Sequence, residues 1–130
     1  MGVKYLFDTN SVIYFLGKVV LSNSAFVKLN TICEYGQHLS IISKLELLGY
    51  RFESLIGEET TKNFVTRSLI YQITSEIEIE TINLRKSNKI KLPDAIIAAT
   101  AIVNDYTLIS ANTKDFKPIT QLKLLNPFDL

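Results

Sequence analysis

The sequence is poor in the residues that build disulfide or zinc frameworks. Its 130 residues include one cysteine, one histidine and no tryptophan. The single cysteine, Cys33, excludes an intramolecular disulfide and is typical of a reducing compartment. Cys33 and His38 are too few to form a Cys/His zinc site. A histidine-based catalytic triad would have to use His38, and no nucleophile elbow or glycine-rich phosphate loop is present.

Long apolar runs and strong net charge are also missing. No stretch approaches 18 consecutive apolar residues, and the N-terminus lacks the pattern of a signal peptide. The net charge of +1 argues against a strongly basic nucleic-acid-binding surface but leaves room for a local basic patch. Length and a hydrophobic content of 47% are typical of one globular domain. We therefore expect a single cytoplasmic domain over residues 1–130.

Short apolar segments alternate with segments of helical periodicity. Strands are predicted at Val3–Phe7, His38–Ile42, Tyr106–Ser110 and Leu122–Leu125. Helices are predicted at Ser11–Leu16, Ala25–Tyr35, Lys44–Leu55 (opened by Ser43), Glu58–Tyr71, Ser75–Asn88 (capped by Thr74) and Asp94–Asn104. The Ser75–Asn88 segment also alternates with period two in its first half, as an exposed strand would. This alternation predicts an α/β fold, a three-layer sandwich with a mostly parallel sheet of about four to five strands flanked by helices.

Oxygen-bearing side chains follow several of these strands. In a parallel sheet the carboxyl ends of the strands meet at one edge, where binding sites form. The segment before Asp94 could bring that residue to the same edge. The candidate residues are Asp8, Ser43, Glu46, Asp94, Asn112 and Asp115.

Each of these residues also has a simpler structural interpretation. Asp8 could cap a helix, Ser43 and Glu46 match a capping box, and Asp94 suits a helix start. Asn112 is equally at home in a turn. Their combination favours a different interpretation, because clustered carboxylates raise one another's pKa unless a cation neutralises them. Mg²⁺ prefers oxygen ligands, and Mn²⁺ can substitute for it.

Four segments, in this order, resemble the PIN-domain family. They are "FDTNSVIYFL" at the start, "SKLELLGY" in the middle, "KLPDAIIAATAIVNDYTLISANTKDF" from Lys91 to Phe116, and the terminal "NPF". The similarity is strongest to the VapC-type toxins of toxin–antitoxin pairs. It implies a parallel α/β sandwich with Mg²⁺-dependent endoribonuclease activity. It also implies a homodimer and a small antitoxin protein as partners, with RNA as the substrate.

The resemblance also assigns site residues. The family's core acids map onto Asp8, Glu46 and Asp94, and Asp115 completes the expected catalytic set. The expected metal ligands are these four and Asn112, which stands where many relatives carry an acid. Whether Asn112, Asp115 or both support the metal is left open. The supporting polar residues are expected to be Thr9, Asn10, Ser43 and Ser110.

Basic residues must offset the repulsion between an acidic pocket and a polyanion. We expect Lys44, Lys91 and Lys114 to contact RNA phosphates, with Arg51, Arg85, Lys86 and Lys89 as further candidates. The alternative is that each is an ordinary solvated surface cation. The apolar content of Phe52–Tyr71 is compatible with a dimer interface, a groove for an antitoxin helix, or ordinary core packing.

Two other functions fit the same residues less well. A catalytically weak PIN-fold module that binds RNA or protein is conceivable, because Asn112 replaces a charged ligand. A phosphatase with Asp8 as nucleophile would need a second aspartate two residues later, where this chain has Asn10. Metal-assisted hydrolysis of phosphodiester bonds is therefore the favoured prediction, with Asp8 and Asp94 holding the metal and Glu46 orienting or deprotonating the attacking water.

Overall fold

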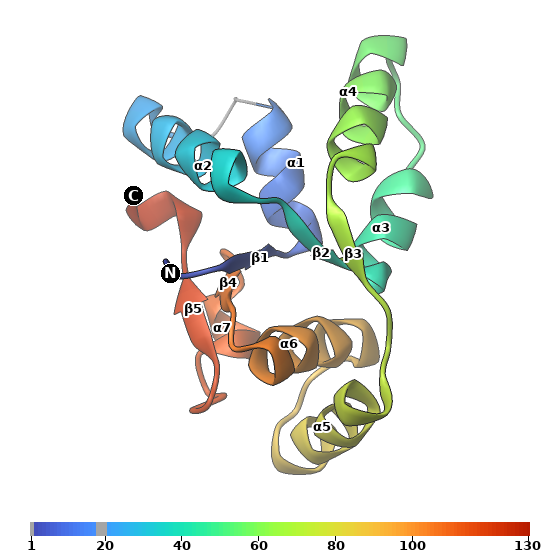
Figure 1. Ribbon diagram of the computed structural model, residues 1–130, viewed down its shortest axis with the longest axis vertical. Helices are drawn as coiled ribbons and strands as arrows, with labels where there is room; N and C mark the ends of the chain where they lie inside the picture. The colour runs from blue at the N-terminus through green and yellow to red at the C-terminus, as the bar shows by residue number, and fades with distance from the viewer. Residues whose placement is uncertain (1, 18–20) are drawn as a thin grey trace.

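A five-stranded parallel sheet lies between two layers of helices (Figure 1). A computed structural model describes residues 2–17 and 21–130. The strands run in the order β3-β2-β1-β4-β5, and every neighbouring pair is parallel. Their bounds are β1 Tyr5–Phe7, β2 His38–Ser40, β3 Leu69–Tyr71, β4 Thr107–Ile109 and β5 Lys123–Leu125. The predicted three-layer α/β architecture is confirmed.

The helices divide into two groups along the chain. Helices α1 to α4 cover one face of the sheet, and α5 to α7 cover the other (Figure 1). Their bounds are α1 Thr9–Gly17, α2 Asn23–Tyr35, α3 Ile41–Leu48, α4 Leu55–Thr66, α5 Ser75–Ser87, α6 Leu92–Asn104 and α7 Thr113–Phe116, followed by a 3₁₀ turn at Pro127–Asp129. Within the described ranges, no helix is long and apolar enough to cross a membrane.

Each face of the sheet carries its own hydrophobic core. Successive strand residues point to opposite faces, so Leu6 and Leu108 pack against α5, α6 and α7. Phe7 and Ile109, one residue further on, pack against α1 to α4. Phe116 is 1% exposed and anchors the short helix α7 in the first of these cores. The sheet is buried on both faces, and only its edges and strand ends can hold a site.

The second predicted strand is too long, and the cap of the helix that follows lies earlier than expected. β2 ends at Ser40, and α3 begins at Ile41. The Ser40 hydroxyl accepts a hydrogen bond from the backbone N–H of Ile42 at 3.1 Å, which satisfies a donor of the first helical turn. Ser43 and Glu46 therefore both lie inside the helix, and their interpretation as a capping box is wrong.

The predicted helices at Lys44–Leu55 and Glu58–Tyr71 are also corrected. The first ends at Leu48, where the N–H of Gly49 bonds to the Leu45 carbonyl. The second begins and ends early, as α4, and its last predicted residues form β3 instead. β3 is an edge strand that pairs with β2, and tertiary pairing of this kind outweighs local periodicity. The predicted helix with Thr74 as N-cap is confirmed, since the N–H of Ile77 bonds to the Thr74 hydroxyl.

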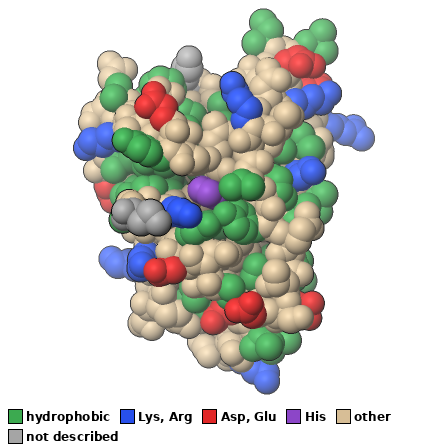
Figure 2. All heavy atoms as spheres, viewed as in Figure 1, with side chains coloured by type: hydrophobic (Ala, Val, Ile, Leu, Met, Phe, Trp, Pro, Cys, Tyr) green, Lys and Arg blue, Asp and Glu red, His purple; other side chains and the backbone are tan. Residues whose placement is uncertain are grey.

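A buried histidine connects β2 to its neighbours at the end of the sheet where the strands begin. His38 Nδ1 lies 2.9 Å from the Tyr71 hydroxyl, which lies 2.7 Å from the Tyr106 hydroxyl. The histidine in Figure 2 is surrounded largely by hydrophobic side chains. Burial lowers the pKa of His38 below its ordinary value of 6.5, and the positive charge of Lys4 lowers it further.

The lowered pKa of His38 makes the stability of the fold depend on pH. The folded state favours neutral His38, whereas the unfolded state binds a proton below about pH 6.5. We therefore expect the His38 contribution to be fully present above pH 6.5 and to decrease as the pH falls toward the folded-state pKa. Urea unfolding of the native protein and of His38→Gln, which keeps a hydrogen-bonding side chain without titrating, would measure this. The free-energy difference between the two proteins should shrink between pH 7.5 and 5.5, and a constant difference would contradict the assignment.

Candidate metal-assisted nuclease site

Asp8 lies at the point where the strand order of the sheet reverses. β2 flanks β1 on one side and β4 flanks it on the other, which is the position where parallel sheets form binding crevices. The Asp8 side chain is 7% exposed, and its Oδ1 accepts a hydrogen bond from the Ser11 backbone N–H at 2.8 Å. Asp8 therefore does cap α1, as the simpler interpretation of the sequence suggested, and it faces the strand-end edge at the same time.

Opposing effects act on the Asp8 carboxyl. Burial raises its pKa above the ordinary value, because the charged form loses hydration. Hydrogen bonds from Ser110 and Ser11 favour the charged form, whereas the nearby charge of Glu46 disfavours it. Burial and repulsion prevail, so the pKa stays raised. Ser110, an expected supporting residue, is fully buried and contacts Asp8 directly.

Helix α3 brings Glu46 to the same edge. The Thr9 hydroxyl donates a hydrogen bond to Glu46 Oε1 at 2.6 Å and lies 3.0 Å from the Ser43 hydroxyl. Ser43 is fully buried, so it fixes the position of Thr9 from within the fold. Thr9 and Ser43, two of the expected supporting residues, thus form hydrogen bonds that hold an otherwise exposed carboxylate in place.

Asp94 joins this group from the first turn of α6. The pKa of its half-buried carboxyl is raised, first by burial and then by the charges of Asp115, Glu46 and Asp8. Only Lys91 acts in the opposite direction, and its effect is the smallest of the five. The structure therefore brings four acids, from the β1–α1 junction, α3, α6 and α7, into one electrostatic neighbourhood.

Asn112 and Asp115 hold each other across the first turn of α7. The amide oxygen of Asn112 accepts a hydrogen bond from the Asp115 backbone N–H at 3.3 Å. The amide nitrogen of Asn112 donates to Asp115 Oδ2 at 3.0 Å. The oxygen of Asn112, the only atom of its amide that suits a hard cation, is thus already engaged in the cap. The carboxylate of Asp115 accepts this bond through Oδ2 only, and its charge raises the pKa of Asp94.

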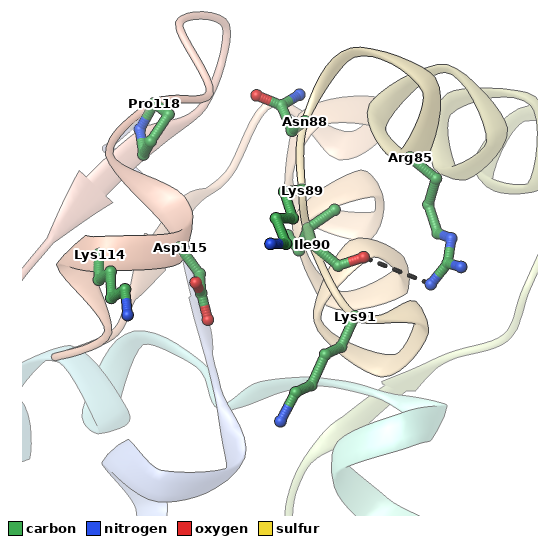
Figure 3. Close-up of a pocket in the computed structure, with 8 residues that line it drawn as sticks. All are labelled: Arg85, Asn88, Lys89, Ile90, Lys91, Lys114, Asp115 and Pro118. Carbon is green, nitrogen blue, oxygen red and sulfur yellow. Dashed lines mark hydrogen bonds between the residues drawn. The ribbon is translucent and has the colours of Figure 1, made fainter.

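The remaining expected residues lie either beside a cavity next to the site or outside that cavity. Asn10 is exposed, and within residues 2–17 and 21–130 its side chain forms no hydrogen bond. Lys44 is half-buried on α3. Lys91 and Lys114 line a cavity that also contains Asp115 (Figure 3). The structure adds Ser11, which sequence analysis missed although its spacing of three residues from Asp8 is the usual spacing of a capping bond.

The donor set suits a hard divalent cation that is shared with a substrate. Among the described residues, no three acidic, histidine or cysteine side chains are arranged to hold one metal ion by themselves. The ion pairs within residues 2–17 and 21–130 are Lys62–Glu58 and Lys123–Asp105, so no site acid forms an ion pair there, and Lys91 acts on Asp94 only through its charge. Mg²⁺ is usually held by one or two carboxylates, waters and a substrate phosphate rather than by a complete protein cage.

Comparison with known proteins identifies the family. The family model described as "PIN domain" matches residues 5–121, which is nearly the whole chain. The chain therefore belongs to the PIN domain family. This family consists typically of nucleases, which supports a hydrolase in general. A comparison with curated protein sequences gave no significant match.

Solved structures of toxin–antitoxin complexes share this fold. The chain is similar to a chain of VapBC2 from Rickettsia felis bound to a promoter DNA fragment, with 24% identity, a TM-score of 0.80, and coverage of 95% of this chain and 98% of that one. A toxin–antitoxin complex from Klebsiella pneumoniae matches with 29% identity, a TM-score of 0.74, and coverage of 98% and 100%. DNA-bound VapBC from Salmonella typhimurium matches with 20% identity, a TM-score of 0.76, and coverage of 97% and 99%.

Two substitutions in metal-free protein test whether Asp8 caps α1 and whether its buried charge destabilises the fold. Asp8→Asn keeps an oxygen that can cap α1 and removes the repelling charge, so we expect it to stabilise the fold by about 1 kcal/mol at pH 7.5. Because the pKa of Asp8 is raised, the gain should decrease as the pH falls toward 3.8.

Asp8→Ala is the matched control for the cap. It removes the same charge and also the capping oxygen, and should therefore be about 1 kcal/mol less stable than Asp8→Asn. Urea unfolding at pH 7.5 and 5.0 measures both differences. A loss of stability in Asp8→Asn, or equal stability of the two variants, would contradict this account.

Proposed function

We propose that this PIN domain is a Mg²⁺-dependent endoribonuclease and the toxin of a toxin–antitoxin pair. The observation that carries the proposal is the group of four mutually repelling acids at the switch point of the sheet, none of which forms an ion pair with a cation among the described residues. Such a group is costly unless it serves to bind a cation. Membership of the PIN family supplies the class of reaction, hydrolysis of nucleic acid.

The four acids take different roles. Asp8 and Asp94, whose pKa values are both raised and which interact through their charges, would hold the cation. Glu46 is more exposed and is fixed by Thr9, which suits it to orient or deprotonate the attacking water. When bound, the cation supplies positive charge to the scissile phosphate and to the attacking water. Asp115 completes the site from α7, and we expect Asn112 to position it rather than to bind the cation.

The products follow from hydrolysis by in-line attack of water. As in the family that the sequence resembles, this attack leaves a 5′-phosphate and a 3′-hydroxyl. Such chemistry does not use the ribose 2′-hydroxyl, so the preference for RNA must come from binding rather than from the reaction itself. Lys91 and Lys114 flank Asp115 and are suited to hold phosphates of the strand.

An antitoxin protein is the proposed partner, with a homodimer as the proposed assembly. The similar structures are described as toxin–antitoxin complexes. The α3–α4 region leaves large apolar side chains uncovered, which favours a protein contact there. Phe64 and Val65 of α4 are buried in the core, whereas Leu55 and Ile56, at its first turn, are each 81% exposed. The apolar content of this segment is thus divided between core packing and an exposed surface.

A non-catalytic binding module is the second candidate. The observation that favours it is the lack of a complete three-ligand group for a metal among the described residues. Calorimetry with Mg²⁺ separates the two functions. Saturable binding that Asp8→Asn abolishes supports the nuclease, and the absence of saturable binding both with and without an uncleavable RNA analogue supports the binding module.

The central prediction concerns cleavage. We expect Asp8→Asn and Asp94→Asn each to lower Mg²⁺-dependent RNA cleavage by about a hundredfold or more, because each removes a charge that holds the cation. Labelled RNA incubated with purified protein, with and without EDTA, measures the rate. The matched control is Asp105→Asn, which removes an exposed carboxylate that pairs with Lys123 outside the site. Cleavage by a folded Asp8→Asn protein at the native rate would refute the proposal.

A further prediction separates Asp115 from Asn112. Asp115→Asn should lower the cleavage rate and raise the Mg²⁺ concentration needed for half-maximal rate, because it removes a charge beside Asp94. Asn112→Ser keeps an N-cap for α7 and should shift that concentration much less. A metal titration of the cleavage rate for both variants gives the comparison. An equal or larger shift in Asn112→Ser would instead make Asn112 a ligand.

A further inference from the structure

Most of the charged side chains that line a cavity next to the acidic site are positive. Its volume is about 670 Å³, within the range of about 300–1,000 Å³ typical of ligand pockets. Its wall on one side is α5 and the connection to α6, with Arg85, Asn88, Lys89, Ile90 and Lys91, and on the other side α7 and the segment after it, with Lys114, Asp115 and Pro118. Figure 3 shows these two walls facing each other across an open gap.

The cations of this cavity are available for a ligand. Over the described ranges, Arg85, Lys89, Lys91 and Lys114 form no ion pair with any carboxylate. Among the described residues, Asp115 is the only acid that lines the cavity. The whole chain carries a net charge of only +1, so this local excess reflects where the cations are placed and not the composition. Unpaired cations that face one cavity attract an anion with several charges.

One of these cations is held in place by the fold. Arg85 Nη1 donates a hydrogen bond to the Ile90 carbonyl at 3.3 Å, across the α5–α6 connection (Figure 3). This bond orients the planar guanidinium and leaves its other N–H groups for a ligand, which suits recognition of phosphate. Ile90, Pro118 and the lysine stems add apolar surface, which suits a sugar or base rather than a bare ion.

Asp115 joins this cavity to the acidic site. It lines the cavity, and its charge raises the pKa of Asp94. A nucleic-acid strand with one phosphate at the acids would therefore continue past Asp115 to the cations of the cavity. In Figure 3 Lys89 lies on the wall formed by the α5–α6 connection, with its ammonium turned toward the side that holds Asp115, and Lys91 extends from the same wall.

We propose that this cavity binds the single-stranded RNA segment next to the scissile phosphate, with Arg85 and Lys89 as strand-binding residues in addition to Lys91 and Lys114. The inference rests on the proposed ribonuclease function and adds a subsite to it. The cations contact phosphates, and the apolar wall contacts one nucleotide. This binding needs neither the metal nor the acids, because the phosphate contacts come from Arg and Lys alone.

The test measures binding without cleavage. A fluorescein-labelled single-stranded RNA of roughly ten nucleotides is titrated with protein in EDTA, and anisotropy is followed at several KCl concentrations. In Lys89→Gln/Lys114→Gln, we expect affinity to fall by about tenfold or more and the slope of log affinity against log salt to decrease by about 0.7 for each phosphate that a lysine no longer neutralises. Neither lysine forms a hydrogen bond or ion pair in the described structure, so the fold should survive the substitution.

The matched control removes the same charge from the opposite layer. Lys28→Gln/Lys62→Gln changes α2 and α4, which lie on the other face of the sheet (Figure 1), and should leave the slope unchanged. Arg85→Lys keeps the charge but removes the planar fork, so it should weaken binding with little change in slope. Equal affinity and slope in the cavity and control variants would overturn the proposal. It would also fall if polyglutamate of matched charge displaced the RNA at equal concentration, since the cavity would then be a site for acidic peptides.

Cleavage measured on the same proteins separates this inference from the proposed function. If the native chain fails to cleave RNA with Mg²⁺ but the cavity variants bind RNA more weakly than the control, the nuclease function fails and the cavity assignment stands. If the native chain cleaves RNA and the cavity variants bind it as the control does, the cavity assignment fails and the nuclease function stands.

Discussion

The placement of one buried carboxylate, Asp8, constrains the rest of the site. The chain cannot leave this group without partners, since burying a charge is costly unless hydrogen bonds compensate. Ser11 from α1 and Ser110 from the end of β4 supply them, and both serines are fully buried for that purpose. Those bonds fix β1, β4 and α1 relative to one another at the switch point of the sheet. Glu46 and Asp94 are then placed near a carboxylate whose position these bonds determine.

The acids of the site and the cations of the adjoining cavity lie close together but form no ion pairs with one another among the described residues. Asp94 and Asp115 repel each other, while Lys89 and Lys114 line the adjoining cavity without an ion pair in the described part of the chain. Direct pairing of these groups would relieve both excesses. Instead, the negatively charged space around the acids and the positively charged space of the cavity adjoin each other at Asp115. A phosphodiester strand with a divalent cation complements both spaces at once, whereas a free cation or a free anion complements only one.

Sequence analysis predicted the features that depend on local signals. Thr74 caps α5 through a bond from the N–H of Ile77, three residues away, and such a signal can be found in a single sequence. β3 was predicted as the end of a helix because its strand character comes from pairing with β2, a partner that the sequence does not identify. The acids could be assigned to one edge because several of them follow strands of a predicted parallel sheet, whose carboxyl ends meet at one edge. The cavity could not, because Arg85 and Lys114 meet only through the packing of α5, α6 and α7.

Helix capping and metal binding are compatible roles for these acids, and capping explains how the metal-free fold tolerates them. Asp8 caps α1, and Asp94 and Asp115 lie in the first turns of α6 and α7. The partial positive charge of a helix N-terminus stabilises a carboxylate there, by about 0.3–1 kcal/mol in exposed positions. Glu46 lies inside α3 without this benefit and is held by the Thr9 hydroxyl instead. Each acid therefore has a local source of stabilisation that does not depend on an ion pair with a cationic side chain.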